Sequence, residues 1–255
     1  MSDKKDQIND FKKAISSTLR AISKKKNINI NFGTDVVIDS NSITLPLPSI
    51  KLEDLEKKEL RGIADSIALK FKYHNKKTHE SLKPKSKVAN KIFDSIESAR
   101  FESLGIIEYS GIKNNLDKHM EAKYKNNQIN NLIHRNEVAI EDAVKLIIQE
   151  KLTNKKLSKK LITLTNTWRK DLEPIIKESI NELKSSIFKQ KDFSAISLKL
   201  TKELQSIQAE IDVDQDNKDD NQDDINNEDD EQKQDNDEEN QNLSEEESEP
   251  EENLS

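Results

Sequence analysis

The charge of this chain changes sign near Ile211, and that change limits which part of it can fold. Residues 1–211 carry 40 Lys and Arg against 28 Asp and Glu, a net charge of +12. Residues 212–255 carry 2 Lys against 21 Asp and Glu, a net charge of −19. The net charge of −7 for the whole chain therefore conceals a basic segment joined to a strongly acidic one.

The acidic segment lacks the apolar side chains that a folded domain buries. Its aliphatic residues are Val213, Ile225, Leu243 and Leu254. Ordering a backbone costs roughly 1–2 kcal/mol per residue, and four scattered aliphatic side chains cannot offset that cost. High net charge combined with low hydrophobicity is typical of disorder. We therefore predict a folded domain over residues 1–211 and a disordered acidic linker or tail over residues 212–255.

The spacing of apolar residues predicts a mostly α-helical domain with a small β insert near its N-terminus. Apolar residues recur every three or four positions over residues 8–22, which indicates an amphipathic helix. Over residues 28–47 apolar and polar residues alternate in three short runs, as in half-buried strands, and predict an antiparallel hairpin or meander. Because Pro46 and Pro48 lack an N–H, the third strand is expected to be short or at the sheet edge.

Helical spacing returns after the β insert and continues to the charge boundary. It predicts helices around residues 52–71, 86–104, 112–120, 140–147, 157–168, 176–187 and 193–211, with a polar loop at 72–86. Gly105 is expected to end the second of these helices, since glycine accepts a left-handed conformation. Asp192 is expected to cap the last helix.

Several classes of protein are excluded by what the composition lacks. The absence of cysteine excludes disulfides, thiolate zinc sites and a cysteine nucleophile. The four glycines, at 33, 62, 105 and 111, cannot form a phosphate-binding loop, which argues against an autonomous ATPase. No signal-like N-terminus or apolar run of about 18–20 residues occurs, so we expect a cytoplasmic protein without a membrane span.

The lysines do not indicate a nucleic-acid site. They are spread over every predicted helix, and aromatic residues that could stack on bases are few. The acidic segment would also compete with nucleic acid for the same basic surface. A solvated lysine surface is the simpler interpretation, and we expect no nucleic-acid partner.

His74 and His79 are the only candidates for a metal site. Helical metal pairs use a spacing of three or four residues, whereas these two are five apart in a lysine-rich segment. A solvated or locally hydrogen-bonded pair is favoured over a metal site.

One block carries more than compositional information. It contains Leu-Arg-Gly-Ile-Ala-Asp at 60–65, then His74, His79 and Pro84, then Phe-Asp-Ser-Ile-Glu-Ser-Ala-Arg-Phe-Glu at 93–102 and Gly-Ile-Lys-Asn-Asn-Leu at 111–116. This block resembles the N-terminal region of the CobT subunit of aerobic cobaltochelatase. A looser resemblance covers roughly residues 9–210.

The resemblance implies a role in vitamin B12 synthesis. The complex of that family inserts Co²⁺ into hydrogenobyrinic acid a,c-diamide, and it uses ATP and Mg²⁺. A large CobN subunit holds the macrocycle, an AAA+ CobS subunit hydrolyses ATP, and CobT assembles with CobS as a chaperone-like partner. The resemblance therefore implies a ligase subunit with no catalytic residue and no bound cofactor of its own.

This sequence departs from the family pattern at its C-terminal side. Family members continue from an acidic linker into a von Willebrand A domain with a metal-adhesion motif, and neither is present here. We expect either a fragment or an A domain that is carried on a separate chain.

Arginine is scarce in this lysine-rich chain, and two of its five arginines fall in the resembling block. Arg offers a planar set of donors that Lys cannot reproduce. We hypothesise that Arg61 and Arg100 orient the central helices by pairing with carboxylates of the block. The candidate partners are Asp65, Asp94, Glu97 and Glu102.

Two other functions stay open at this point. One is a histone-chaperone-like module, in which the acidic tail binds basic proteins. The other is direct delivery of cobalt through His74 and His79. Deletion of residues 212–255 separates the first from the assembly role, because only the tail-dependent module would lose all binding.

Overall fold

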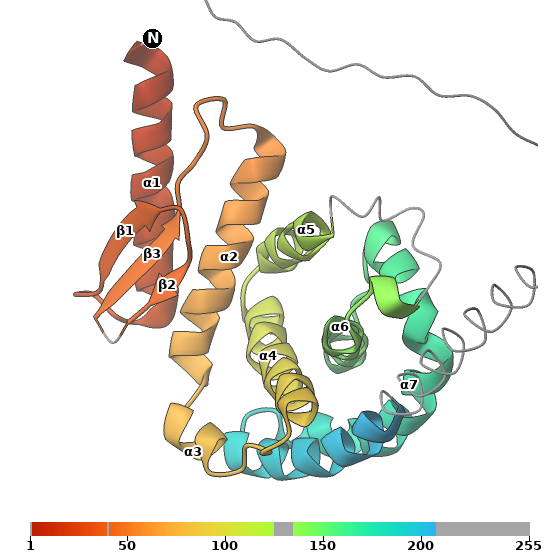
Figure 1. The fold of residues 1–255 in the computed structure, drawn as a ribbon. Coiled ribbons are helices and arrows are strands. Elements are labelled where there is room, and N and C mark those ends of the chain that lie inside the picture. Colours follow the sequence, from red (N-terminus) through yellow and green to blue (C-terminus); the bar gives the residue numbers. More distant parts are fainter. Residues whose placement is uncertain (1, 40, 125–134, 208–255) are drawn as a thin grey trace, which may run out of the picture. The chain divides into compact units, whose positions relative to one another are not determined.

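The computed structural model describes residues 2–39, 41–124 and 135–207 (Figure 1). It confirms a mostly helical chain with a small sheet near the N-terminus. None of the described helices is long and apolar enough to cross a membrane. The elements are α1 Ser2–Ser23, β1 Asn29–Gly33, β2 Val37–Ile38, β3 Ser42–Pro46, α2 Asp54–Tyr73, α3 Lys76–Glu80, α4 Lys87–Glu108, α5 Ile112–Lys123, η3 Arg135–Glu137, α6 Ile140–Thr153, α7 Lys159–Ser186 and a last helix over residues 190–207.

The predicted acidic tail and its boundary at residues 211–212 lie outside the described residues. The division into a folded domain and a disordered tail therefore stays a prediction.

The sheet has the order β1-β3-β2, which differs in part from the predicted meander. β2 pairs with β3 in antiparallel fashion, but β1 pairs with β3 in parallel. The third strand takes the centre because it carries the two fully buried aliphatic side chains, Ile43 and Leu45. Of the two alternatives predicted from Pro46 and Pro48, the edge position was wrong, and the strand is a short one of 5 residues. Pro46 is the last residue of β3, and beyond it the Leu47 N–H donates to the Gly33 carbonyl at 2.8 Å.

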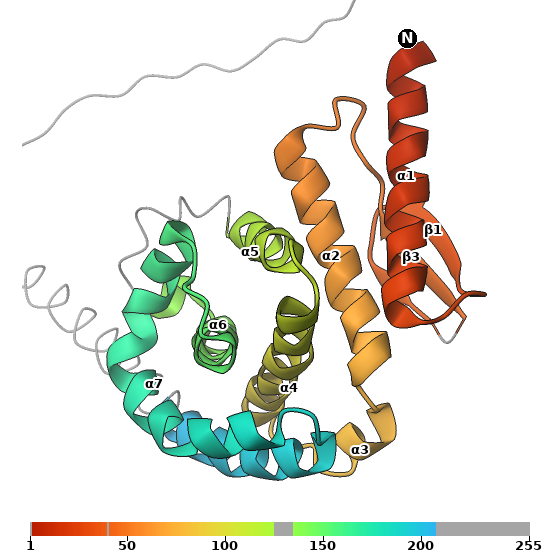
Figure 2. The same ribbon diagram turned by 180° about the vertical axis from the view of Figure 1, so that it is seen from behind.

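One apolar core joins the sheet to the helices on both sides of α2. In Figures 1 and 2, α1 and the sheet lie on one side of α2, and α4 and α5 lie on the other. Phe11, Ile15 and Leu19 of α1 pack in the same buried cluster as Ile67 of α2 and Phe101 of α4. α2 is therefore the central support from which the polar residues at its C-terminal end are presented.

The second half of the domain is built around α6, which packs against α4 on one side and α7 on the other. α7 was predicted as two helices separated at Pro174, and the structure instead shows one curved helix (Figure 1). Its buried stripe continues across the proline, from Trp168 and Leu172 to Ile176 and Ile180. Burial of this continuous apolar face outweighs the loss of one backbone hydrogen bond at the proline.

Three further local predictions are corrected by the structure. Gly105 lies inside α4, which continues to Glu108, so it does not end the helix. A Cβ at this position would come within 2.4 Å of the Leu69 side chain. The glycine is therefore explained by close helix packing. Asp192 lies inside the last helix, which begins at residue 190, so it is not the cap. The segment 72–86, predicted as a loop, includes the short helix α3.

Candidate functional site

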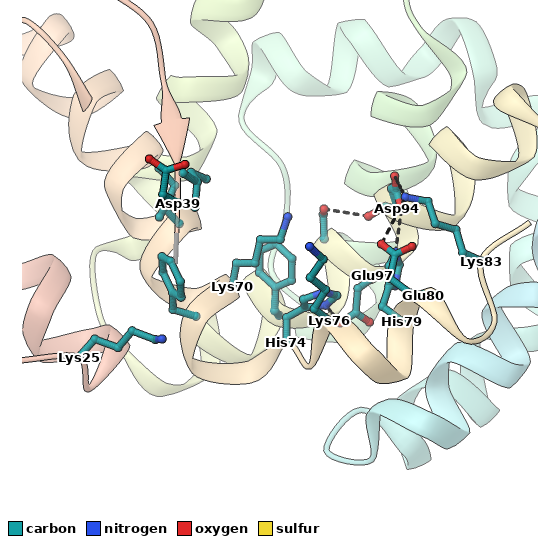
Figure 3. Close-up of a pocket in the computed structure, with 15 residues that line it drawn as sticks. Lys25, Asp39, Lys70, His74, Lys76, His79, Glu80, Lys83, Asp94 and Glu97 are labelled. Atoms are coloured by element: carbon teal, nitrogen blue, oxygen red, sulfur yellow. Dashed lines mark hydrogen bonds and ion pairs between the residues drawn. The ribbon is translucent and has the colours of Figure 1, made fainter. Parts of the chain in front are cut away.

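Polar residues from the end of α2, from α3 and from α4 meet at a cavity of about 620 Å³ (Figure 3). The cavity lining includes His74, His79, Asp94 and Glu97, all four of which the sequence singled out. His74 directly follows α2, His79 lies in α3, and Asp94 and Glu97 lie within α4. The site thus depends on how the end of α2 and the short helix α3 are held against α4.

The first polar group at this site is a buried cluster centred on Glu97. Arg100 donates to it twice, from Nε to Oε2 at 2.9 Å and from Nη2 to Oε1 at 2.7 Å. His74 Nδ1 lies 2.8 Å from Oε1 of the same carboxylate. Burial raises the pKa of Glu97, but the hydrogen bonds from Arg100 and His74 outweigh this and leave its pKa below the ordinary value. Glu97 is therefore ionised near neutral pH, and the His74 Nδ1–H is the donor.

Arg100 also connects elements that are far apart in the sequence. Its Nη2 donates to the Tyr73 carbonyl at 2.7 Å, and its Nη1 donates to the Ile187 carbonyl at 3.2 Å. Tyr73 is the last residue of α2, and Ile187 directly follows α7. Arg100 is only 1% exposed, so these contacts are made away from water. One side chain therefore satisfies the backbone at two helix ends while it neutralises Glu97.

The second polar group is formed by His79 and Asp94. His79 Nε2 lies 2.7 Å from Asp94 Oδ1, and Lys83 Nζ lies 3.7 Å from Oδ2. Burial raises the pKa of Asp94, but the His79 hydrogen bond and the Lys83 charge outweigh it, so the net pKa is lowered. The His79 ring stacks on Phe93 with 4.8 Å between centroids, and it meets the His74 ring edge-on at 4.9 Å.

The two histidines are thus hydrogen-bonded to carboxylates, one of the alternatives favoured from their spacing. His79 is buried, with 5% of its surface exposed, and His74 is partly buried, so neither side chain is fully solvated. Its Nδ1 has no hydrogen-bond partner among the described residues. Within the same residues, no group of three or more His, Cys, Asp or Glu side chains is placed to hold a metal ion. Since His74 Nδ1 and His79 Nε2 are hydrogen-bonded to carboxylates, each ring has one other nitrogen, His74 Nε2 and His79 Nδ1, that a cation could bind.

Arg61, unlike Arg100, is not buried. Arg61 is exposed on α2, where its guanidinium lies 5.5 Å from the centre of the Phe11 ring. Asp65 accepts a hydrogen bond from Asn115 Nδ2 at 2.8 Å. Burial raises the pKa of Asp65 to about 6, against the opposing effects of that hydrogen bond and the Arg61 charge. Arg61 therefore acts on Asp65 through space, and no ion pair joins them in the described part of the chain.

Glu102 lies in a separate buried centre and does not contact either predicted arginine. It accepts from Ser66 Oγ at 2.7 Å, from Lys145 Nζ at 2.8 Å and from Gln149 Nε2 at 3.1 Å. This centre ties α2, α4 and α6 together. Sequence reasoning missed Lys145 and Gln149, although Gln149 follows two buried isoleucines on α6 and is itself 4% exposed. A polar residue inside an apolar stripe was the signal that could have identified it.

A protein-family model described as cobalamin biosynthesis protein CobT matches residues 5–255 of this chain. No solved structure matches this chain.

Proposed function

Because the chain belongs to the CobT family of cobalamin biosynthesis proteins, we propose that it is a non-catalytic assembly subunit of an ATP-dependent cobaltochelatase. In this role the complex inserts Co²⁺ into hydrogenobyrinic acid a,c-diamide, and the AAA+ CobS and the large CobN subunits are the partners. ATP, Mg²⁺ and Co²⁺ are used by the complex. The chain itself contributes a scaffold on which the other subunits are positioned.

The network around Arg100 is the observation that supports this proposal. Its guanidinium donates to Glu97 and to two backbone carbonyls, and its charge is almost completely buried. A catalytic group must be free to reach a substrate, whereas this one is fully engaged in joining α2, α4 and the end of α7. Arg100 and Glu97 therefore hold the helices together, and their charged groups are not free to bind a substrate.

Reconstitution of the chelatase from purified subunits tests the proposal. The full chain, CobS and CobN are mixed with ATP, Mg²⁺, Co²⁺ and the corrinoid substrate, and cobalt insertion is followed by absorbance. We expect no insertion without this chain, and neither ATP hydrolysis nor insertion by the chain alone. ATP turnover by the chain alone, or insertion at the full rate without it, would contradict the proposal.

The acidic segment supports a second candidate, a binding module for basic proteins, because it carries 21 Asp and Glu in residues 212–255. Deletion of this segment distinguishes the two. An assembly subunit keeps its binding to CobS after the deletion, as measured by co-purification. A module that acts through the acidic segment loses binding to every partner.

A further inference from the structure

One edge of the sheet, at β2, carries three consecutive exposed aliphatic residues. Val36, Val37 and Ile38 are 44%, 47% and 46% exposed, and β2 pairs with β3 alone among the described strands. Proteins commonly protect a sheet edge with a lysine or a proline on the edge strand, and none of these three residues is either. Such an edge is a template on which a further strand can pair.

The backbone of this edge has groups that face outward. The Asp39 N–H donates to the Ser42 carbonyl at 2.9 Å, so Asp39 and, two residues earlier, Val37 turn their backbone groups toward β3. Because the direction of these groups alternates along an antiparallel strand, those of Val36 and Ile38 point away from β3. A further strand can therefore form hydrogen bonds with Val36 and Ile38.

The side chains at the same two positions extend the buried face of the sheet. Ile38 lies opposite Ile43 of β3, which is fully buried, and residues opposite one another in a sheet point to the same face. Val36, two residues before Ile38, points to that face as well. Val36 and Ile38 thus form the outer row of an apolar face, and a strand added beside them would continue it.

The cavity of Figure 3 adjoins this outer row. Ile38 lines it together with Ile67 and Phe71 of α2 and Phe101 of α4. Asp39, the residue directly after β2, lies among the side chains drawn there (Figure 3). The inward side chains of a strand added at β2 would therefore reach this cavity of about 620 Å³ beside apolar side chains.

The charges of the cavity favour an uncharged occupant. Four lysines and four carboxylates line it, so their formal charges cancel. Both signs occur toward each end, with Lys25 and Asp39 at one end and Lys83 and Asp94 at the other (Figure 3). A further charge buried among them would lack a partner and cost free energy, whereas an aliphatic side chain carries no such cost.

The acidic segment of this chain, residues 212–255, does not match the edge. A strand that fills the cavity needs aliphatic residues at alternate positions. The aliphatic residues of the segment are at positions 213, 225, 243 and 254, so no two of them fit within one strand of ordinary length. Its 21 Asp and Glu would also be repelled by Asp35 and Asp39, which flank the three exposed aliphatic residues.

A second copy of the chain does not match the edge either. Antiparallel pairing of β2 with the same strand of another copy, centred on Val37, would set Asp35 opposite Asp39 at both ends. Like charges directly opposite one another destabilise a sheet. Asp35 and Asp39 instead favour a strand with a basic residue at each end.

We infer that β2 and the adjoining cavity bind an extended strand of a partner protein, with aliphatic residues at alternate positions and a basic residue at each end. Its backbone pairs with Val36 and Ile38, and its inward side chains pack beside Ile38, Phe71 and Phe101. The inference deepens the proposed assembly role and rests on it, because it names the kind of segment by which a partner is held.

A synthetic peptide, Lys-Thr-Val-Thr-Ile-Thr-Val-Thr-Lys, is a suitable probe. It is labelled with fluorescein and titrated with the full chain, with binding followed by fluorescence anisotropy. One variant is N-methylated on its aliphatic residues and another on its threonines. A strand paired with β2 turns the N–H groups of one set toward β2 and those of the other set away. One N-methylated peptide should therefore bind at least about tenfold more weakly, and the other should bind within about threefold of the probe.

Two substitutions at neighbouring positions test the face of β2 that is used. Ile38→Ser should weaken binding by about fivefold, since it removes aliphatic surface that the strand covers. Val37→Ser is the matched control. Its side chain points to the other face of the sheet, so this change should alter the affinity by less than about twofold. Both residues are exposed, so neither change should unfold the chain.

A peptide with Glu in place of both Lys residues tests the charge of the strand ends, and it should bind at least about threefold more weakly at low ionic strength. Tighter binding of this peptide would overturn the inference. So would absence of binding by the probe, equal affinities of the two N-methylated peptides, or equal losses in Ile38→Ser and Val37→Ser.

Sedimentation equilibrium of the chain alone tests the second copy as occupant, and we expect a monomer. A dimer that Ile38→Ser dissociates would assign the edge to self-association and also overturn the inference. The peptide titration contains neither CobS nor CobN, so a negative result there is distinguishable from failure of the assembly role in the reconstituted complex.

Discussion

The Arg100 guanidinium binds both carboxylate oxygens of Glu97, which lies one turn earlier on α4. The distances are 2.9 Å from Nε to Oε2 and 2.7 Å from Nη2 to Oε1. Such a two-bond pairing needs the planar fork of arginine, and a lysine ammonium cannot reproduce it. Both side chains are more than 95% buried, so neither charge can turn to water if the other is removed.

Arg100→Lys is therefore expected to lower the free energy of unfolding by about 2–4 kcal/mol, because the carbonyls of Tyr73 and Ile187 lose donors as well. Urea denaturation followed by circular dichroism measures the change. Arg61→Lys is the matched control. Arg61 is exposed, so its replacement should cost less than about 1 kcal/mol. Equal effects of the two substitutions would contradict the buried role of Arg100.

The contrast between these two arginines shows what the sequence could predict. Their scarcity and their place in the resembling block singled out both positions. The apolar residues Leu60, Ala64 and Ile67 define the buried face of α2, and residue 61 lies outside that face. This spacing could have indicated that Arg61, unlike Arg100, is exposed. The carbonyl partners of Arg100 could not have been found, because any backbone carbonyl is an acceptor and the fold alone decides which one is near.

The strand order of the sheet could not be predicted from the sequence for a similar reason. Alternation at residues 28–47 identified three strands and the buried face of β3, since period-two patterning reports which side chains point inward. It did not do so for β2, where Val37 and Ile38 are both exposed. It does not report which strand lies beside which. Ile43 and Leu45 take the centre of the sheet only because the surfaces of α1 and α2 are there to cover them.

Asp65 is expected to give the chain a pH dependence of the opposite sign to that of Glu97. Burial raises its folded-state pKa from 3.8 to about 6, so the folded chain binds the extra proton between these pH values. The stabilisation from that proton is fully present below pH 3.8 and is lost as the pH rises through about 6. In Asp65→Asn this loss is absent. The free energy of unfolding of the variant, relative to the original chain, should thus rise by roughly 2–3 kcal/mol between pH 4 and pH 7.

Urea titrations of both proteins at several pH values measure that difference. The opposite contributions of Asp94 and Glu97, whose pKa values are lowered, are common to both proteins and cancel. Asp10→Asn, at an exposed position on α1, is the control and should show no such trend. A flat difference between Asp65→Asn and the original chain would rule out the raised pKa.

Glu102 and Lys145 are expected to be strongly coupled in stability. The Lys145 ammonium lies 2.8 Å from a carboxylate that is 1% exposed, and replacement of either partner leaves the other charge buried without it. Glu102→Gln and Lys145→Met should each lower the free energy of unfolding by about 2–4 kcal/mol. The double variant should lose less than the sum by about 1–3 kcal/mol, because it strands no charge. Additive losses in this double-mutant cycle would mean that the pair has no energetic link.

Gly62 and Gly105 both lie in helix interiors, but their replacements should differ in whether they can be rescued. A Cβ at residue 62 would come within 2.2 Å of the Asn115 carbonyl oxygen, which belongs to the backbone of α5. Gly62→Ala therefore forces α2 and α5 apart, and we expect a loss of about 2–3 kcal/mol that no side-chain change relieves. At residue 105 the obstacle is the Leu69 side chain, at 2.4 Å.

Gly105→Ala should consequently be rescued in part by Leu69→Ala, which removes the atoms in the way. The double variant should lose at least about 1 kcal/mol less than the sum of the single losses. Thermal and urea unfolding of Gly62→Ala, Gly105→Ala, Leu69→Ala and the double variant measure these terms. If the losses from Gly105→Ala and Leu69→Ala are additive, then Gly105→Ala pushes the α4 and α2 backbones apart, as Gly62→Ala is expected to do for α2 and α5. In that case the two glycines would have the same role, which is to allow two backbones to approach.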